Sequence, residues 1–450
     1  MPNTSKIQIV KYAPPPPELP IYGRENSAEV SFIGRTNYVA ALEEKKFIFG
    51  IKRSDRRRNV YVIGKSAVGK SKLLELLIRQ DIAYGHGLCL IDPYGDLADS
   101  ILDFIPEERV EDVVFLDFSD EKHTFFFNPL VGIDKNLKHQ AVEGLIITIK
   151  KFFGASWSHK LEYIFRFICL ALLDYPEATM RSITLMLTDA SFREKVLGFV
   201  QDEIVKHFWV VEFQRWFDRF EGETAMPLLN KFAQFISDPV LGKVFAQKEN
   251  RINFIDFISQ KKIVLINLTK EKLGEENSSF LGALFVLKLK EAMNYRAFRK
   301  DSNYEDFYIY IDEFHNLVSE IFEQLVSEAR KYKFCLTLSH QYLKQLSPTV
   351  QSIVLGNAGT IIVFRVSGED ALRLEPELSP MFKVKDMINL GVQEFYIKIT
   401  INGETYDPFS AETLKVFSPA HESFRGKIIT VSKKVFANPS NFIEASVKNH

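Results

Sequence analysis

The segment at residues 64–71 constrains the fold of this chain more strongly than any other part of its sequence. It reads GKSAVGKS and matches the pattern G-x-x-x-x-G-K-[ST] in full. An apolar run at 59–63 precedes it, and apolar residues with helical spacing follow it at 71–84. A loop of this kind between a strand and a helix directs backbone N–H groups and the helix dipole toward phosphate groups. The segment therefore predicts a phosphate-binding loop within an α/β fold.

Each position of this loop has a predicted part in binding ATP. The two glycines allow backbone N–H groups to converge on the phosphates, Lys70 reaches the β and γ phosphates, and the Ser71 hydroxyl binds Mg²⁺. The predicted nucleotide-binding residues are Gly64, Lys65, Ser66, Ala67, Val68, Gly69, Lys70 and Ser71.

Short apolar runs that alternate with helical spacing indicate parallel strands joined by helices. We expect strands at residues 59–63, 88–91, 112–117, 262–267, 307–311, 334–338 and 360–365. Between residues 138 and 258 the strand pattern is absent, and apolar residues recur with helical spacing. The predicted fold class is therefore α/β, with a mainly parallel central sheet and an inserted all-α domain.

The sequence divides into five expected segments. Residues 1–58 are predicted to form an N-terminal arm, because the proline run at 14–17 suits neither a helix nor a central strand. The other four are residues 59–137 and 259–412, the two parts of an ATPase domain, residues 138–258, the all-α insertion, and residues 413–450, a helical or partly disordered tail.

A basic run lies at the end of the predicted arm. It comprises Lys52, Arg53, Arg56, Arg57 and Arg58. Such a run forms either a solvated loop or an edge that contacts phosphate groups, and the sequence leaves both alternatives open.

A second motif, at residues 307–313, supplies the acidic groups that hydrolysis requires. It reads FYIYIDE, an aromatic and aliphatic strand followed by two acids. Asp312 is predicted to hold Mg²⁺, and Glu313 is predicted to act as the general base for water. The alternative is that the two acids only cap the helix that follows. The continuous apolar run before them is typical of a buried central strand and favours the catalytic interpretation.

Further candidates lie near the end of the strand at 334–338. Ligands collect at such strand ends in open α/β sheets, so Gln341 is expected to contact the γ phosphate or the attacking water. Arg330 is predicted to act across a subunit boundary as an arginine finger, with Arg365 as the second choice. A surface ion pair is the alternative for each arginine. We interpret His340 as a packed or capping histidine.

Two acids in the segment IDPYGDL at residues 91–97 have two possible roles. Asp92 and Asp96 either support the metal and sense the nucleotide, or belong to a turn that Asp-Pro and Gly build. The sequence does not decide between them.

Charge and cysteine content exclude some classes of protein. Lys plus Arg number 57 and Asp plus Glu 58, so any contact with DNA must be local and non-specific. Cys89, Cys169 and Cys335 lie in apolar runs without zinc-ligand spacing and are expected to be reduced, buried and inert. Neither a secretory signal nor a membrane span is expected. These patterns predict a cytoplasmic protein that reaches the inner face of the cell membrane only through partners.

Several motifs occur in the order seen in the FtsK/HerA superfamily. They are GKSAVGKS, IDPYGDL, the FNPL element at 127–130, YIDEFHNL, SEARKYKFCLTLSHQYL and GNAGTIIVFRV. Over residues 30–412 the chain most resembles the cytoplasmic ATPase domain of type IV secretion coupling proteins of the TraD/TraG kind. The resemblance implies a RecA-like, hexameric ring ATPase that uses ATP and Mg²⁺ and moves DNA, or a relaxase-bound strand, through a central channel. It also supports Arg330 as the finger and Gln341 as the sensor.

Two features depart from that family. Coupling proteins commonly carry an N-terminal transmembrane anchor, which is not expected here, so a HerA-like role in DNA processing is also open. His315 stands where related sequences often have Gln.

Three functions fit these motifs. The preferred hypothesis is an ATPase ring that translocates DNA, with relaxase or secretion-channel proteins as expected partners. An ATPase that powers protein secretion or pilus assembly is the nearest alternative, because no residue distinguishes the cargo. The third is a nucleotide-gated scaffold with little turnover, although Glu313 argues against it because a pure switch needs no base.

Overall fold

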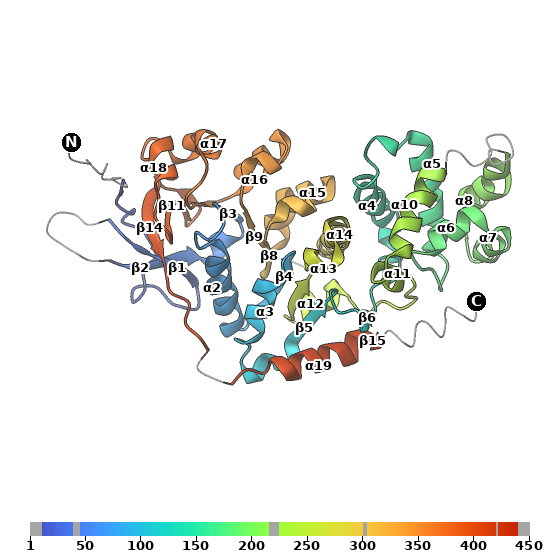
Figure 1. Cartoon of the computed structure of the whole chain (residues 1–450), viewed down its shortest axis with the longest axis horizontal. Helices are drawn as coiled ribbons and strands as arrows, with labels where there is room; N and C mark the ends of the chain where they lie inside the picture. The colour runs from blue at the N-terminus through green and yellow to red at the C-terminus, as the bar shows by residue number, and fades with distance from the viewer. Residues whose placement is uncertain (1–10, 39–45, 216–224, 300–303, 420–421, 440–450) are drawn as a thin grey trace, which may run out of the picture.

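We describe the fold from a computed structural model, which covers residues 11–38, 46–215, 225–299, 304–419 and 422–439. Among these residues eleven strands form one sheet, in the order β2-β1-β14-β11-β10-β3-β9-β8-β4-β7-β5 (Figure 1). Helices cover both faces of the sheet, and a separate group of helices lies at the end of the molecule opposite β1 and β2.

One half of the sheet consists of parallel strands. Its strands are β10 (Thr360–Val363), β3 (Val60–Ile63), β9 (Phe334–His340), β8 (Phe307–Ile311), β4 (Gly87–Asp92), β7 (Ile263–Asn267) and β5 (Val113–Asp117). Nearly every residue in them is buried, because helices cover both faces of a parallel sheet and leave no solvated face. All seven strands predicted from apolar runs are confirmed.

The other side of the sheet is antiparallel. Its strands are β2 (Ile48–Lys52), β1 (Val30–Thr36), β14 (Phe409–Thr413) and β11 (Glu394–Lys398). The assignment of residues 1–58 to an arm is therefore wrong for β1 and β2. Glycines interrupt the strand pattern in both, and Gly50 is required because a Cβ there would lie 2.3 Å from the backbone oxygen of Ser31.

Helices pack on the two faces through alternate residues of the strands. Val60 and Val62 of β3 join one core, and Tyr61 and Ile63 join the other, as the two-residue period of a strand requires. The first face carries α2 (Lys70–Ala83) and α3 (Asp96–Leu102). The second carries α14 (Glu275–Arg299), α15 (Glu320–Glu328) and α16 (Pro348–Asn357), while α17 (Gly368–Leu378) and α18 (Val384–Ile388) lie beside β11.

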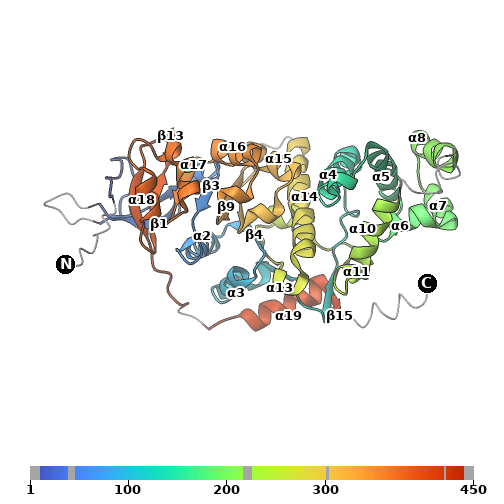
Figure 2. The ribbon, with the colours of Figure 1, turned by 45° about the horizontal axis from the view of Figure 1, so that its top comes forward.

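A helical segment separates β6 (His123–Phe125) from β7. In the described residues it comprises α4 (Lys138–Lys150), α5 (His159–Leu172), α6 (Ser182–Thr188), α7 (Ala190–Leu197), α8 (Glu203–His207), the π-helical turn Phe208–Glu212, α10 (Met226–Ser237), α11 (Leu241–Val244) and α12 (Phe254–Ser259). Figure 2 shows α14 between this segment and the helices on the sheet. Aromatic rings make the contact, since Phe280 of α14 stacks on Phe235 at 4.3 Å and meets Phe152 edge-on at 4.9 Å.

The C-terminal tail returns to the sheet. Its helix α19 (Arg425–Phe436) lies along the edge strand β5, where Phe115 N–H donates to the Ser432 hydroxyl at 3.1 Å. Strand β15 (Ala437–Pro439) then pairs with β6. The helical alternative for the tail is confirmed over α19, and its last residues lie outside the described part of the chain.

The basic run at 52–58 is neither a solvated loop nor a phosphate-binding edge. Arg53 and Arg56 are buried, and both pair with the buried carboxylate of Asp81 on α2. Arg56 also donates to the Tyr310 hydroxyl at 2.6 Å, two residues before Asp312. The sequence could not show this arrangement because the acid that neutralises the run lies on another helix. The network ties the phosphate-loop helix to β8.

Two further expectations concern the cysteines and the membrane. The three cysteines are buried free thiols, and burial raises the pKa of each. In the part of the chain that the structure describes, we find no helix with the length and apolar character of a membrane span.

Candidate active site

The predicted phosphate loop connects β3 to α2 with the backbone that its residue types require. Gly69 has φ = 121°, in the region that favours glycine, and a Cβ on Gly64 would lie 2.5 Å from the Cβ of Phe364. The Lys70 amine donates to the backbone oxygens of Gly64 and Lys65 at 2.6 and 2.9 Å. Burial lowers the pKa of Lys70, while the charges of Glu313 and Asp312, just after β8, act in the opposite direction. The amine is thus held inside the loop that is expected to receive phosphate.

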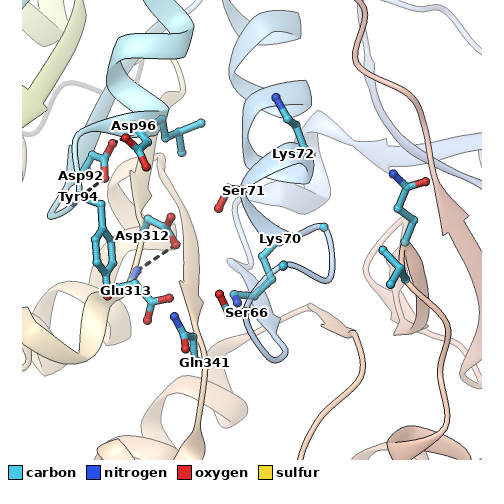
Figure 3. A pocket seen from close by; sticks show the side chains of 15 residues that line it. Ser66, Lys70, Ser71, Lys72, Asp92, Tyr94, Asp96, Asp312, Glu313 and Gln341 are labelled. Atoms are coloured by element: carbon cyan, nitrogen blue, oxygen red, sulfur yellow. Dashed lines mark hydrogen bonds between the residues drawn. The ribbon is translucent and has the colours of Figure 1, made fainter.

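The loop faces a cavity of about 470 Å³, which lies within the usual range for a small-molecule site. Figure 3 shows the loop and the start of α2 on one side and the carboxyl ends of the parallel strands β4, β8 and β9 on the other. The predicted residues that line the cavity are Ser66, Ala67, Gly69, Lys70, Ser71, Asp92, Asp96, Asp312, Glu313 and Gln341. The sheet therefore brings residues from four distant segments to one place, as parallel strand ends do. Gly64, Lys65 and Val68 belong to the loop but do not line the cavity.

Asp312 and Glu313 form an acidic pair at the end of β8. Both are buried, and the backbone N–H of Glu313 donates to Oδ1 of Asp312 at 3.0 Å (Figure 3). Burial raises the pKa of Asp312 to about 6, and the charges of Glu313 and Asp92 add to this effect. A bound cation would relieve this repulsion, and a carboxylate with the Ser71 hydroxyl is an oxygen donor set of the kind that Mg²⁺ prefers. The residues therefore fit the predicted metal.

Asp92 is held by backbone groups of its own turn. Its carboxylate accepts hydrogen bonds from the N–H groups of Tyr94, Leu97 and Ala98 at 2.9–3.0 Å. Burial raises its pKa, and these hydrogen bonds partly offset that rise. Asp92 thus caps the start of α3, as the turn alternative predicts. It is buried and Asp96 is exposed, and both line the cavity.

The remaining candidates lie in three different environments. Gln341 lines the cavity beside Glu313 (Figure 3). Arg330 is exposed, makes no side-chain hydrogen bond or ion pair to a described residue, and lies before the N-terminal end of β9, whereas the cavity lies beyond its C-terminal end. Arg365 is half-buried outside the cavity, where its backbone oxygen accepts from Lys65 N–H at 2.9 Å. The structure thus brings Gln341 to the cavity and Arg365 to the phosphate loop through its backbone, but neither arginine lines the cavity.

His340 is a packed histidine, as predicted. Its ring lies 4.8 Å from that of Phe314, and its Nδ1 lies 3.4 Å from the Tyr61 hydroxyl. Burial lowers the pKa of His340 to about 3, with smaller contributions from His315 and Lys70. The imidazole is therefore neutral at physiological pH.

Two residues that line one wall of the cavity were not predicted from the sequence. Val392 and Gln393, just before β11, line the cavity on the side of the phosphate loop. Gln393 adopts φ = 69°, and its N–H donates to the backbone oxygen of Val68 at 3.0 Å. Val392 is 59% exposed despite its apolar side chain. Nothing local marks these two residues, because only the antiparallel return of β11 brings them to the loop.

The fold is similar to that of two kinds of solved protein. Plasmid coupling protein TrwB with the GTP analogue GDPNP has a TM-score of 0.61 at 15% identity, over 83% of this chain and 90% of that one. TrwB with ADP and Mg²⁺ has a TM-score of 0.60 at 15% identity, over 83% and 89%. VirB4 of Thermoanaerobacter pseudethanolicus has a TM-score of 0.54 at 14% identity, over 82% and 94%.

This chain has the fold of TrwB and VirB4. The α/β class and the fold expected from the sequence resemblance are thereby confirmed. No family model matches the sequence, and no curated protein does either.

Lys70→Ala is expected to weaken ATP binding by at least about tenfold, because a charge-assisted hydrogen bond contributes about 1.5–3 kcal/mol. Calorimetric titration with ATP and Mg²⁺ measures the affinity, and thermal unfolding checks the fold. Lys248→Ala, which removes an exposed lysine of the helical segment, is the matched control. Undiminished affinity in the Lys70 variant would place the nucleotide elsewhere.

Asp312→Asn is expected to stabilise the nucleotide-free protein at pH 8. The folded state raises the pKa of Asp312 from 3.8 to about 6, so its contribution to stability is fully present below pH 4 and is lost as the pH rises through 6. This difference in pKa between the folded and unfolded states makes the expected gain in the free energy of unfolding at most about 3 kcal/mol at pH 8 and about half of that at pH 5. Denaturant unfolding at the two pH values measures the gain.

The same variant is expected to bind ATP with little dependence on Mg²⁺. A stability gain that does not fall between pH 8 and pH 5 would contradict the titration of Asp312. If ATP binding by the variant still depended on Mg²⁺ as in wild type, Asp312 would not be a metal ligand.

Proposed function

We propose that this chain is a subunit of an ATP-hydrolysing ring motor of the type IV secretion kind, which translocates DNA. The observation that carries the proposal is the placement of Lys70 and Ser71 across one cavity from Asp312, Glu313 and Gln341. The fold of TrwB and VirB4 supports it, and TrwB binds ADP and Mg²⁺ in one of its structures.

The residues of the cavity provide the parts of phosphoryl transfer. Lys70 and the loop N–H groups neutralise the phosphate oxygens, and Gln341 orients the attacking water. The Glu313 carboxylate accepts a proton from that water as its oxygen attacks the γ phosphorus and the bond to the ADP oxygen breaks. Mg²⁺, held by Ser71 and Asp312, would offset the negative charge on the phosphates.

DNA as cargo follows from the family resemblance, and charge determines how it would bind. The chain carries a net charge of −1, and residues 141–250 contain thirteen basic and fourteen acidic residues. A single subunit therefore has little attraction for DNA. In a hexameric ring, a few basic groups on each subunit would together neutralise many phosphates in a central channel, and binding would weaken as salt rises.

The setting of the motor forms part of the proposal. We place the ring in the cytoplasm, at the inner face of the cell membrane when partners hold it there. Relaxase or secretion-channel proteins are the expected partners. Protein secretion is the second candidate, because no residue of the chain distinguishes a DNA cargo from a protein cargo.

The decisive experiment measures ATPase rate against DNA concentration at low and high salt. The oligomer is first sized by mass with ATP and Mg²⁺, and Lys70→Ala protein is the control for contaminating activity. We expect DNA to raise the rate at low salt and to lose this effect at high salt. A rate indifferent to DNA in a confirmed oligomer would favour protein cargo, and no turnover at all would leave a nucleotide-gated scaffold.

A further inference from the structure

The chain makes a fixed turn directly after Glu313. Glu313 itself adopts φ = 44° and ψ = 47°, a left-handed conformation that is uncommon outside glycine. In the 3₁₀ turn Phe314–Leu317 that follows, Asn316 N–H donates to the Glu313 backbone oxygen at 3.2 Å. Lys151, at the end of α4, donates to the Asn316 backbone oxygen at 2.8 Å. The backbone after Glu313 is thus held by two hydrogen bonds, whereas the side-chain torsions of Glu313 remain to be fixed.

One oxygen of the Glu313 carboxylate is buried and has no hydrogen-bond partner among the described residues. That oxygen is Oε2, and the nearest polar side-chain atom recorded for it is Nδ1 of His315, 3.4 Å away. Nδ1 also has no partner within hydrogen-bond geometry. The Glu313 side chain is 5% exposed and that of His315 is 16% exposed. A buried polar atom without a hydrogen-bond partner reduces stability by about 1–3 kcal/mol. If Oε2 and Nδ1 approach by a few tenths of an ångström, one hydrogen bond between them satisfies both atoms.

Gln345 determines which nitrogen of His315 carries the proton. Its Oε1 accepts from Tyr342 N–H at 3.3 Å, which assigns the orientation of the amide and turns the NH₂ group toward His315. Nε2 of Gln345 lies 3.1 Å from Nε2 of His315. An amide nitrogen only donates, so Nε2 of His315 accepts. In the neutral imidazole the proton is then on Nδ1, the atom that faces Glu313.

We propose that His315 is a positioning residue for the catalytic base. Gln345 holds His315 in the Nδ1–H tautomer, so that Nδ1–H donates to Oε2 of Glu313. This rests on the proposed function, in which Glu313 is the base. With Oε2 engaged, Oε1 is the oxygen left to face the cavity and accept the proton of water. Hydrogen bonds of catalytic groups are often long before substrate binds and shorten in the loaded site, in keeping with 3.4 Å here.

The pair also connects the site to the surface. Gln345 is exposed and belongs to the turn Leu343–Gln345, which follows Gln341 and precedes α16. A partner that moved this turn would change the support of Glu313 without touching the nucleotide. His315 thereby acquires a role that the sequence left unassigned.

The test compares kcat, KM and nucleotide affinity for His315→Ala, His315→Asn and Gln345→Ala with wild type. Asn places its side-chain NH₂ close to the position of Nδ1, so it preserves the donor to Glu313 but not the contact with Gln345. His315→Ala is expected to lower kcat by about tenfold or more, with KM and nucleotide affinity within about twofold of wild type. His315→Asn is expected to recover kcat to within about threefold of wild type.

Gln345→Ala is expected to lower kcat in the same direction as His315→Ala. The double variant should be no slower than His315→Ala alone, because both changes remove one interaction. Lys344→Ala, an exposed lysine in the same turn, is the matched control and should leave kcat unchanged.

Three outcomes would overturn the proposal. One is a wild-type kcat in His315→Ala, and another is an Asn variant no faster than the Ala variant. The third is loss of nucleotide affinity in step with kcat, which indicates a general loss of structure. If His315→Ala does not fold, the kcat values of His315→Asn and Gln345→Ala still test whether His315 positions Glu313. A wild-type protein without ATPase activity would instead count against the proposed function, so the two failures are distinguishable.

Discussion

Glu313→Gln is expected to lower the rate of ATP hydrolysis by about a hundredfold or more, the range for loss of a positioned general base. The amide has the shape of the carboxylate but does not accept a proton from water. Nucleotide and Mg²⁺ binding should persist, because Lys70, Ser71 and Asp312, the residues predicted to make those contacts, remain in place. Single-turnover phosphate release measures the chemical step, and calorimetry measures the affinity.

The matched control for this variant is Glu320→Gln. Glu320 is an exposed acid at the start of α15, outside the cavity, so its change should leave the rate within about twofold of wild type. A wild-type rate in the Glu313 variant would show that another group takes the proton. A parallel loss of ATP affinity would instead mean that Glu313 helps to hold the nucleotide.

The parallel half of the sheet could be predicted from the sequence because its signal is local. A strand buried on both faces must be apolar at nearly every position, and this produces runs such as FYIYI at residues 307–311. The antiparallel half carries no such signal. In β1 and β2 glycines stand where another backbone approaches, and their need for glycine is visible only once the neighbouring strand is in place.

The candidate site likewise contains residues that a local motif predicts and residues that only the fold brings together. The phosphate loop, Asp312 and Glu313 were predictable because each belongs to a short motif whose chemistry requires that spacing. Gln341 followed from its place at a strand end. Gln393, by contrast, reaches the loop through the fold, and the pairing of Arg56 with Asp81 depends on a helix packing that no local pattern reveals.

The position of Arg330 determines how it could act. It is exposed in the turn before β9, at the opposite end of that strand from Gln341, and it does not line the cavity of its own chain. A ring built from head-to-tail contacts joins two different faces of the subunit at every interface. In the proposed ring, an exposed arginine without a partner among the described residues would be available to a neighbouring subunit's site. If Arg330 acts in catalysis within the proposed ring, we expect it to act in trans.

Arg330→Ala is therefore expected to lower ATP turnover in the assembled ring by roughly a thousandfold, the range for an arginine finger supplied in trans. Steady-state turnover in an oligomer confirmed by mass measures the effect, while ATP affinity stays unchanged because Arg330 lies outside the cavity. Lys331→Ala, the exposed neighbour on the same turn, is the matched control. Arg365→Ala tests the second choice.

Mixing the Arg330 variant with Lys70→Ala protein separates action in trans from a structural effect. Each variant alone lacks one part at every interface, since one lacks the finger and the other lacks the phosphate-loop lysine. In mixed rings at equal amounts, about a quarter of the interfaces pair an intact loop with an intact Arg330, if the subunits mix at random. Turnover should therefore reappear on mixing, well above the sum of the two variants. No recovery, with co-assembly shown independently by mass, would contradict the finger and leave Arg330 a role within its own subunit.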